Sequence, residues 1–118
     1  MSMNSNKWEE LTSIQQLEKI IDESENKMIL LFKYSTRCST SRLMFDRLQR
    51  SWEQDEMATV VPYVLDLITY REISNAIAEY FQIEHQSPQV ILINRKKAIY
   101  DGSHFEIEYQ SIKKLVKN

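Results

Sequence analysis

Hydrophobic residues recur along the chain in two patterns. One is the three- and four-residue spacing of a helix with a single apolar face, and the other is the short unbroken run of a strand buried on both sides. Helices are predicted over residues 14–25, 43–52, 73–81 and 112–116. Strands are predicted over residues 8–11, 28–32, 60–67, 88–93 and 98–100. The apolar stripes of the second and third helices include Leu43 and Tyr80.

Turn and cap signals separate these elements. Residues 12–15 and 69–72 each place a threonine three positions before Gln or Glu, which is typical of a capping box at the start of a helix. Residues 94–97 are few enough to join two strands as a hairpin. The Asp101-Gly102 pair predicts a turn.

The order of the elements is β, α, β, α, β, α, β, β, α. It predicts an α/β fold with a central mixed sheet covered by helices on both faces. The length of 118 residues predicts one domain over residues 1–118. Sites in such sheets lie beyond the carboxyl ends of parallel strands, which is where Cys38 stands, between the strand 28–32 and the next helix.

Composition and charge exclude several classes of function. A net charge of −2 argues against a nucleic-acid surface. The longest apolar run, residues 28–32, is too short to cross a membrane, and residues 1–10 lack the apolar centre of a secretory signal. A single glycine leaves no glycine-rich phosphate loop. A single cysteine cannot form an intramolecular disulfide, so we expect the protein to reside in the reducing cytoplasm.

The only cysteine lies in the segment YSTRCSTSR, residues 34–42. If the second helix begins at or just after Cys38, its free N–H groups favour the thiolate, and Arg37 and Arg42 add positive charge if they lie near the sulfur. The hydroxyl groups that could donate hydrogen bonds to the same anion belong to Ser39, Thr40 and Ser41. The alternative is that Cys38 is a small, inert apolar residue at the end of a strand.

Other polar residues have simpler interpretations. Ser87-Pro88 precedes a buried strand, and from the residues alone its peptide bond is expected to be trans. The two histidines do not have the spacing of a zinc site with Cys38, so no metal is expected. Asp66 is a possible proton acceptor beneath the cysteine, although acids at strand ends are usually solvated.

Three segments carry a resemblance to a known family. They are TRCSTS (residues 36–41), HQSPQV (85–90) and SHFEI (103–107). Together with the order of the elements, they resemble the YtxJ-like monothiol bacilliredoxin family of the thioredoxin superfamily, over most of the chain from Trp8 to Val116. That family usually has proline directly after the cysteine and a small uncharged residue before it, where this chain has Ser39 and Arg37.

The resemblance implies a thioredoxin-like fold and a cis Ser87–Pro88 bond packed against Cys38. The backbone of Ser87 would then bind a partner as an added strand does. The resemblance also implies bacillithiol, a small thiol with an anionic malate group, as co-substrate, with no bound cofactor. The partners would be bacillithiolated proteins.

In this interpretation, the Cys38 thiolate attacks the bacillithiol sulfur of a mixed disulfide and the client thiol leaves. Ser41 stands where a dithiol enzyme has its resolving cysteine, so the second thiol must come from free bacillithiol or another redoxin. The malate charge could be met by Arg37, Arg42 or Lys33. Two alternatives stay open: a non-catalytic thioredoxin-like binding module that uses the Ser87–Pro88 face, and a redox sensor in which Cys38 is itself modified.

Overall fold

The computed structural model describes residues 8–117. Residues 1–7, which belong to the segment predicted not to be a secretory signal, lie outside this range. The helices are α1 (Ile14–Glu23), α2 (Ser39–Ser51), α3 (Arg71–Phe81) and α4 (Tyr109–Lys117), with a short 3-10 helix η1 (His104–Glu106). The strands are β1 (Glu9–Glu10), β2 (Met28–Tyr34), β3 (Val60–Asp66), β4 (Gln89–Asn94) and β5 (Lys97–Ser103). This order is the predicted one.

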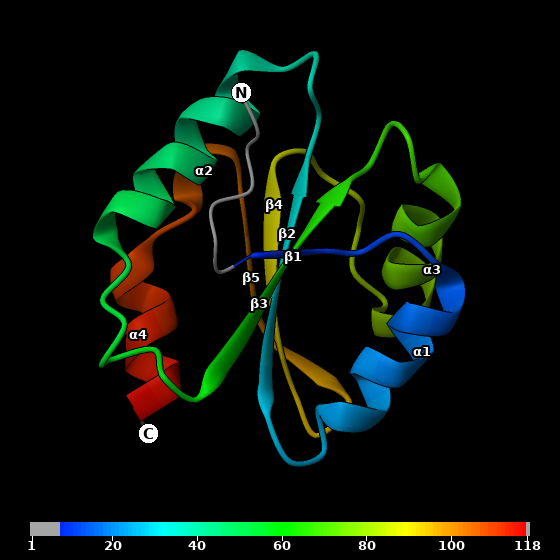
Figure 1. Cartoon of the computed structure of the whole chain (residues 1–118). Helices are drawn as coiled ribbons and strands as arrows, with labels where there is room; N and C mark the ends of the chain where they lie inside the picture. The colour runs from blue at the N-terminus through cyan, green and yellow to red at the C-terminus, as the bar shows by residue number, and fades with distance from the viewer. Residues whose placement is uncertain (1–7, 118) are drawn as a thin grey trace.

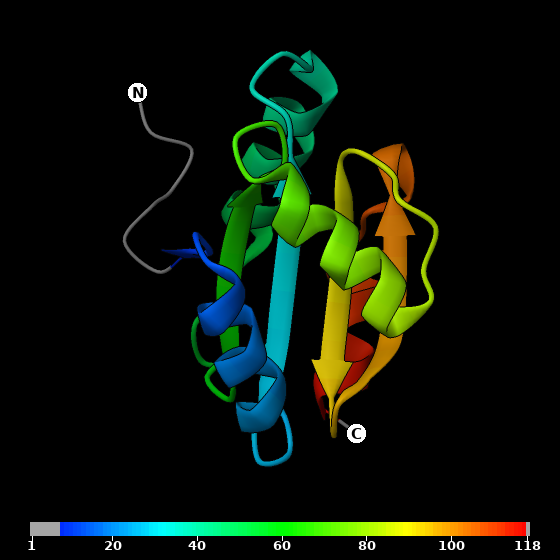
Figure 2. The same cartoon turned by 90° about the vertical axis from the view of Figure 1, so that its right-hand side faces the viewer.

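The strands form one five-stranded sheet in the order β1-β3-β2-β4-β5. β3 is parallel to both β1 and β2, whereas β4 is antiparallel to β2 and to β5. Helices α1 and α3 cover one face of the sheet, and α2 and α4 cover the other (Figures 1 and 2). The predicted α/β class, with a mixed sheet between two helical layers, is confirmed.

Strand β2 lies at the centre of the sheet and supplies both halves of the core. Leu30 and Phe32 pack into the cluster on the α2 and α4 side, where the Phe32 and Phe45 ring centroids lie 4.9 Å apart. Ile29 and Leu31 pack into the cluster on the α1 and α3 side. Since each fully buried aliphatic side chain contributes about 1.5–3 kcal/mol, this strand anchors the fold and the segment that follows it.

The capping box of α1 is shifted by one residue from its predicted place. Ser13 is the N-cap, and its Oγ accepts a hydrogen bond from the Gln16 N–H at 3.0 Å. The Gln16 Oε1 accepts one from the Thr12 N–H at 2.9 Å. The sequence TSIQQ contains two hydroxyl residues and two glutamines, so it allows two capping boxes. The structure forms the one made by Ser13 and Gln16, which fits the first turn of the helix.

The capping box predicted over residues 69–72 is wrong. Tyr70 is the N-cap of α3 and makes no cap hydrogen bond with its side chain. Instead the Asp66 carboxylate accepts hydrogen bonds from the N–H groups of Ile68 and Thr69 and from the Thr69 hydroxyl, the last at 2.8 Å. A short acidic side chain commonly closes such a turn, and this role accounts for Asp66 without a proton transfer to Cys38.

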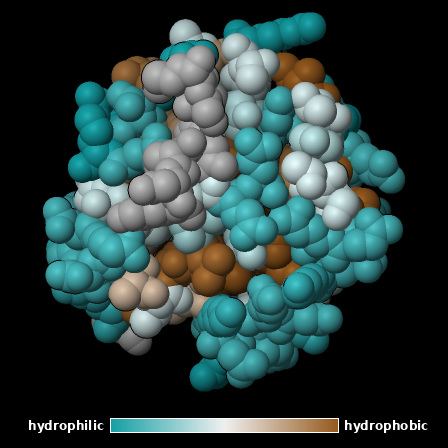
Figure 3. Space-filling model, in the orientation of Figure 1, coloured by the Kyte–Doolittle hydropathy of each residue, from teal (hydrophilic) through white to brown (hydrophobic). Residues whose placement is uncertain are grey.

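Two residues assigned to the apolar stripes are in fact exposed. Leu43 is 49% exposed and Tyr80 is 50% exposed. In α2 the buried side is formed by Met44, Phe45 and Leu48, and because successive residues rotate by about 100° around a helix, Leu43 is turned outward. Figure 3 shows a face of the molecule that is largely hydrophilic, with hydrophobic residues visible near its lower centre. In residues 8–117, no helix has the length and hydrophobicity needed to span a membrane.

The hairpin between β4 and β5 is confirmed, and it is tied to the end of α1. Arg95 and Lys96 have φ values of 54° and 64°, as expected for a two-residue hairpin turn. The Arg95 N–H donates to the backbone oxygen of buried Ser24 at 2.6 Å, and the Lys96 N–H donates to the Ser24 Oγ at 2.9 Å.

The turn predicted at Asp101-Gly102 is wrong, because both residues belong to β5. The chain turns after the strand, at His104, whose φ is 55°. Gly102 is required for a close approach: a Cβ at this position would lie 2.7 Å from the Tyr100 Oη. The residue type that suggested a turn therefore makes room for a tyrosine ring.

Gly102→Ala is expected to lower the free energy of unfolding by about 1–3 kcal/mol, the usual cost of overpacking. Denaturant titration would measure this change. In a Tyr100→Phe background the closest contact is removed, so the same substitution should cost clearly less. An equal cost in both backgrounds would contradict the proposed clash.

Candidate active site

Cys38 is the residue at which the β2–α2 connection becomes a helix. It is the N-cap of α2, with extended φ and ψ values of −114° and 115°, and helical structure begins at Ser39. The helix therefore begins four residues before the range 43–52 that the apolar spacing predicted, and it meets the condition that it start just after the cysteine. The side chain is half-buried, so the sulfur is not sealed within the core.

Two serines shape the connection between β2 and Cys38. The Ser35 N–H donates to the Oγ of Ser41 at 3.1 Å, and the Cys38 N–H donates to the Ser35 oxygen at 3.1 Å. The Arg37 N–H donates to the Ser35 Oγ at 3.2 Å. Ser41 is fully buried. The sequence predicted the Ser41 hydroxyl near the thiol but not its hydrogen bond with the Ser35 N–H. The position of Ser41, three residues after the N-cap, was the signal that could have suggested this structural role.

The pKa of the Cys38 thiol is lowered from its ordinary value. The main cause is the backbone N–H of Ser41, and the Thr40 N–H and the hydroxyls of both residues add to it, while burial opposes it. The Cys38 side chain makes no cap hydrogen bond, and the Ser41 N–H donates to the Cys38 backbone oxygen at 3.1 Å, so these groups act on the sulfur as the positive end of the helix rather than as its fixed partners. The first turn of α2 therefore favours the thiolate, as expected for a helix N-terminus.

The two arginines beside Cys38 do not account for the lowered pKa of the thiol. Arg37 and Arg42 are exposed, and neither is among the causes of the lowered Cys38 pKa. Ser39 is also exposed and does not contribute. Charges at the surface are strongly screened by water and salt, whereas the backbone N–H groups of the first turn are fixed at the helix start next to Cys38.

The Ser87–Pro88 peptide bond is cis, as the family resemblance implied and contrary to the expectation from the residues alone. The Pro88 oxygen accepts a hydrogen bond from the His104 N–H at 3.0 Å. In the antiparallel pairing of β2 with β4, Lys33 lies opposite Gln89, so β4 begins where β2 ends. Ser87-Pro88 and the loop before Cys38 therefore lie at the same edge of the sheet (Figures 1 and 2). Direct packing of Pro88 on Cys38 stays a prediction.

Lys33 is a buried cation at this edge. Its side chain is fully buried, and within residues 8–117 its Nζ has no hydrogen-bond partner. Burial lowers the pKa of Lys33 to about 8. The sequence pattern placed the end of the buried run at Phe32. The one signal that Lys33 is buried was its spacing of two residues from Leu31, which puts both side chains on the same face of β2.

Further polar groups lie in α3 and in the loop before the cis peptide. The Oγ of Ser74, in the first turn of α3, is 3.2 Å from the His85 Nδ1. The pKa of His85 is lowered by burial and by the positive charges of Lys33 and Arg71. The buried Ser87 Oγ has no hydrogen-bond partner among the described residues. In the same part of the chain, no three His, Cys, Asp or Glu side chains are placed to hold a metal ion.

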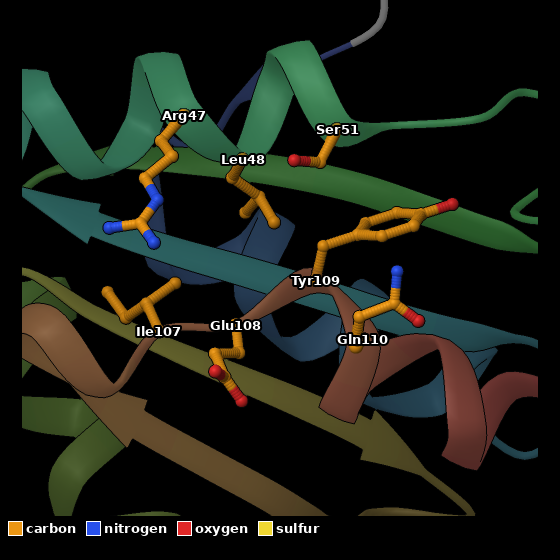
Figure 4. Close-up of a pocket in the computed structure, with 7 residues that line it drawn as sticks. All are labelled: Arg47, Leu48, Ser51, Ile107, Glu108, Tyr109 and Gln110. Atoms are coloured by element: carbon orange, nitrogen blue, oxygen red, sulfur yellow. The ribbon is translucent and has the colours of Figure 1, made fainter.

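A pocket of about 170 Å³ lies between α2 and the start of α4, away from the thiol. Figure 4 shows Arg47, Leu48 and Ser51 on α2 facing the segment of residues 107–110. Arg47 is nine residues after Cys38, about 13 Å along a helix axis. We therefore place the candidate site at the helix start and not in this pocket.

The first prediction for the site concerns the origin of the low thiol pKa. Thr40→Val removes a hydroxyl donor and should raise the pKa of Cys38, as measured by the pH dependence of alkylation. Arg37→Gln and Arg42→Gln should change it less, because the guanidinium groups are exposed. A larger change in the arginine variants would show that charge, and not the helix start, activates the sulfur.

The second prediction concerns the cost of the buried lysine. The folded state lowers the pKa of Lys33 from 10.5 to about 8 and so favours its neutral form. At pH 7, Lys33→Met should therefore raise the free energy of unfolding, by up to about 3 kcal/mol at 1.36 kcal/mol for each pKa unit. Lys27→Met, at an exposed position, should have little effect.

The gain from Lys33→Met should shrink as the pH rises from 8 to 10.5. In this range the unfolded wild-type chain holds its proton more tightly than the folded chain, so wild-type stability rises with pH. Denaturant unfolding of both proteins at several pH values would measure the difference. A constant difference, or a loss of stability at pH 7, would show that the ammonium is stabilised by groups other than those described.

Comparison with known proteins agrees with this geometry. The family model described as "Monothiol bacilliredoxin BrxC" matches residues 9–112. The chain is similar to a thioredoxin-fold protein described as a candidate oxidoreductase, with 25% identity, 95% of each chain covered and a TM-score of 0.79. It shares the fold of Fasciola hepatica thioredoxin, with 16% identity over 92% of this chain and 96% of that one and a TM-score of 0.71. It also shares the fold of a Malassezia sympodialis thioredoxin, with 10% identity over 93% of this chain and 88% of that one and a TM-score of 0.73.

These matches support a thiol redox function on a thioredoxin fold. They also agree with the motifs that suggested the family, since the matched range contains all three of them. Because the family model spans most of the chain, the protein belongs to the monothiol bacilliredoxin family.

Proposed function

We propose that this protein is a monothiol thiol–disulfide oxidoreductase that removes bacillithiol from protein mixed disulfides through Cys38. The observation that carries the proposal is the half-buried Cys38 sulfur at the start of α2, with its pKa lowered by the Ser41 and Thr40 N–H groups. Thiolate is the reactive form in disulfide exchange, so a lowered pKa increases the reactive fraction at neutral pH. Membership of the bacilliredoxin family supports bacillithiol as the small thiol.

In the first step, the Cys38 thiolate attacks the bacillithiol sulfur of the client's mixed disulfide. A sulfur–sulfur bond forms between Cys38 and bacillithiol as the bond between bacillithiol and the client breaks. The client leaves as a thiolate and takes a proton from water. The client is thereby reduced, and Cys38 carries the bacillithiol.

In the second step, the thiolate of a free bacillithiol attacks the adduct. Cys38 leaves as a thiolate, and two bacillithiol molecules depart as a disulfide, so the electrons gained by the client come from bacillithiol. An internal resolution is excluded because Cys38 is the only cysteine of the chain. Ser41, at the position of a resolving cysteine, is instead buried and accepts a hydrogen bond from Ser35.

The departures from the family pattern fit the observed helix start. Ser39 is the first residue of α2, a position that favours proline because its N–H would have no partner within the helix. Serine is also compatible with this position, and the donors that lower the Cys38 pKa belong to later residues. Arg37 precedes the helix and is exposed, so its size meets no steric limit in the core.

The test is turnover of a bacillithiolated client protein by substoichiometric enzyme with excess bacillithiol. The wild-type protein should release many equivalents of client thiol, measured by mass spectrometry of the client. Cys38→Ser should reduce the rate to the uncatalysed background, because the attacking sulfur is lost. Arg50→Gln, at an exposed position near the end of α2, is the control and should keep wild-type turnover.

Turnover by Cys38→Ser would contradict the proposal. A single equivalent of client released, with the adduct remaining on Cys38, would favour a redox sensor. Binding of the client without any exchange would favour a binding module.

A further inference from the structure

A fully buried lysine without a partner calls for a functional explanation. Lysine is almost never fully buried unless it is paired, because an isolated charge is costly in an apolar environment. Lys33 is fully buried, and in the described part of the chain its Nζ has no hydrogen-bond partner. A neutral apolar residue would fill this position on β2 at lower cost. The chain nevertheless places a cation here, five residues before the reactive cysteine.

The surroundings of Lys33 place this charge beside the cis peptide. Lys33 lies opposite Gln89, the residue after Pro88. The hydrogen-bonded pair of Ser74 and His85 links the loop before the cis peptide to the first turn of α3. The charges of Lys33 and Arg71 both reach His85. The buried Ser87 Oγ, also without a partner, belongs to the same loop. Positive charge is therefore concentrated on the α3 side of this loop.

An acidic pocket lies on the same face of the sheet, toward β5, and Gln89 is part of its lining. The pocket, of about 300 Å³, is lined by three acids, Glu84, Asp101 and Glu106, together with polar side chains. An anionic group would be repelled from these carboxylates and attracted to the side that holds Lys33. Strand β4 thus lies between the buried cation on β2 and an acidic flank beside β5.

The exposed arginines near Cys38 are weaker candidates for binding an anion. Arg37 and Arg42 are exposed, and within residues 8–117 neither forms an ion pair. Water and salt screen such charges, whereas a buried charge acts through a medium of low dielectric constant. Of the three cations that could meet an anionic group of the substrate, Lys33 therefore has the strongest field.

We infer that Lys33, Arg71, His85 and Ser87 form a subsite for the carboxylate of an anionic small thiol on the α3 side of the Ser87–Pro88 peptide. Lys33 acts there as a specificity-determining residue, through its field rather than by direct contact, because its side chain is fully buried. The inference rests on the proposed function, since the thiol bound in this subsite is the one transferred to Cys38. It adds the prediction that small thiols are selected by charge.

The test compares two adducts of the same client, one with bacillithiol and one with uncharged 2-mercaptoethanol. Single-turnover transfer to Cys38 is followed at increasing concentrations of excess enzyme. Lys33→Met should raise the half-saturating concentration about tenfold for the bacillithiol adduct and leave the limiting rate unchanged. For the 2-mercaptoethanol adduct, both values should stay within about twofold of wild type. Lys27→Met, exposed and distant, should behave as wild type.

A second readout locates the subsite without exchange. In a Cys38→Ser background, reduced bacillithiol should shift the NMR signal of the His85 ring, and Lys33→Met should weaken this effect. The ring of His104, on the acidic flank, serves as the internal reference. The uncharged comparison ligand is 2-mercaptoethanol, which should not shift His85.

The outcomes separate the subsite from the function. Equal effects of Lys33→Met on the two adducts, or loss of charge selectivity in Arg37→Gln or Arg42→Gln instead, would overturn the subsite while transfer to Cys38 stands. An unshifted His85 signal would do the same. If the wild-type protein transfers neither adduct, the proposed function fails and the subsite fails with it.

Discussion

The first turn of α2 is the constraint on which the site depends. Ser41 acts there twice: its Oγ accepts a hydrogen bond from the Ser35 N–H, and its own N–H is the main cause of the lowered Cys38 pKa. The first contact sets the path of the chain between β2 and the helix. The second acts on the sulfur placed by that path. One buried serine therefore couples the end of the central strand to the state of the thiol.

The sheet supplies the rest of the site through the pairing of β2. Because β4 is antiparallel to β2, its beginning lies beside the end of β2, where the cis Ser87–Pro88 peptide meets the edge that carries Cys38. The same strand carries Lys33 into the layer below α3. A thiol, a cis peptide and a buried cation are thus positioned by one strand, whose apolar residues pack on both faces of the sheet.

The features that sequence predicted well are those set by local pattern. The order of the elements and the burial of residues 29–32 follow from periodicity, whereas the start of α2 at Ser39 lies four residues before the first apolar residue of the predicted helix. The cap of α1 was misplaced by one residue because TSIQQ contains two equivalent pairs. Asp101-Gly102 resembles a turn, but the glycine is needed for the Tyr100 ring, a contact that no local pattern reveals.

The missing parts of the site depend on tertiary structure. Lys33 follows an apolar run, at a position where a charged residue is usually solvated, yet its side chain is fully buried. The cis geometry of Ser87–Pro88 was suggested by family resemblance and not by residue type, since most such bonds are trans. The arginines beside Cys38 appeared to be the source of its activation, but exposure removes them from that role.

The central claim is that Cys38 attacks as a thiolate stabilised by the start of α2. The most direct measurement is the pH dependence of the first transfer of bacillithiol from a client protein to Cys38, followed by rapid mixing and acid quench. The account predicts that the rate rises to a plateau with a midpoint below the ordinary thiol value near 8.5. A midpoint at or above 8.5, or a rate without any dependence on thiol ionisation, would contradict it.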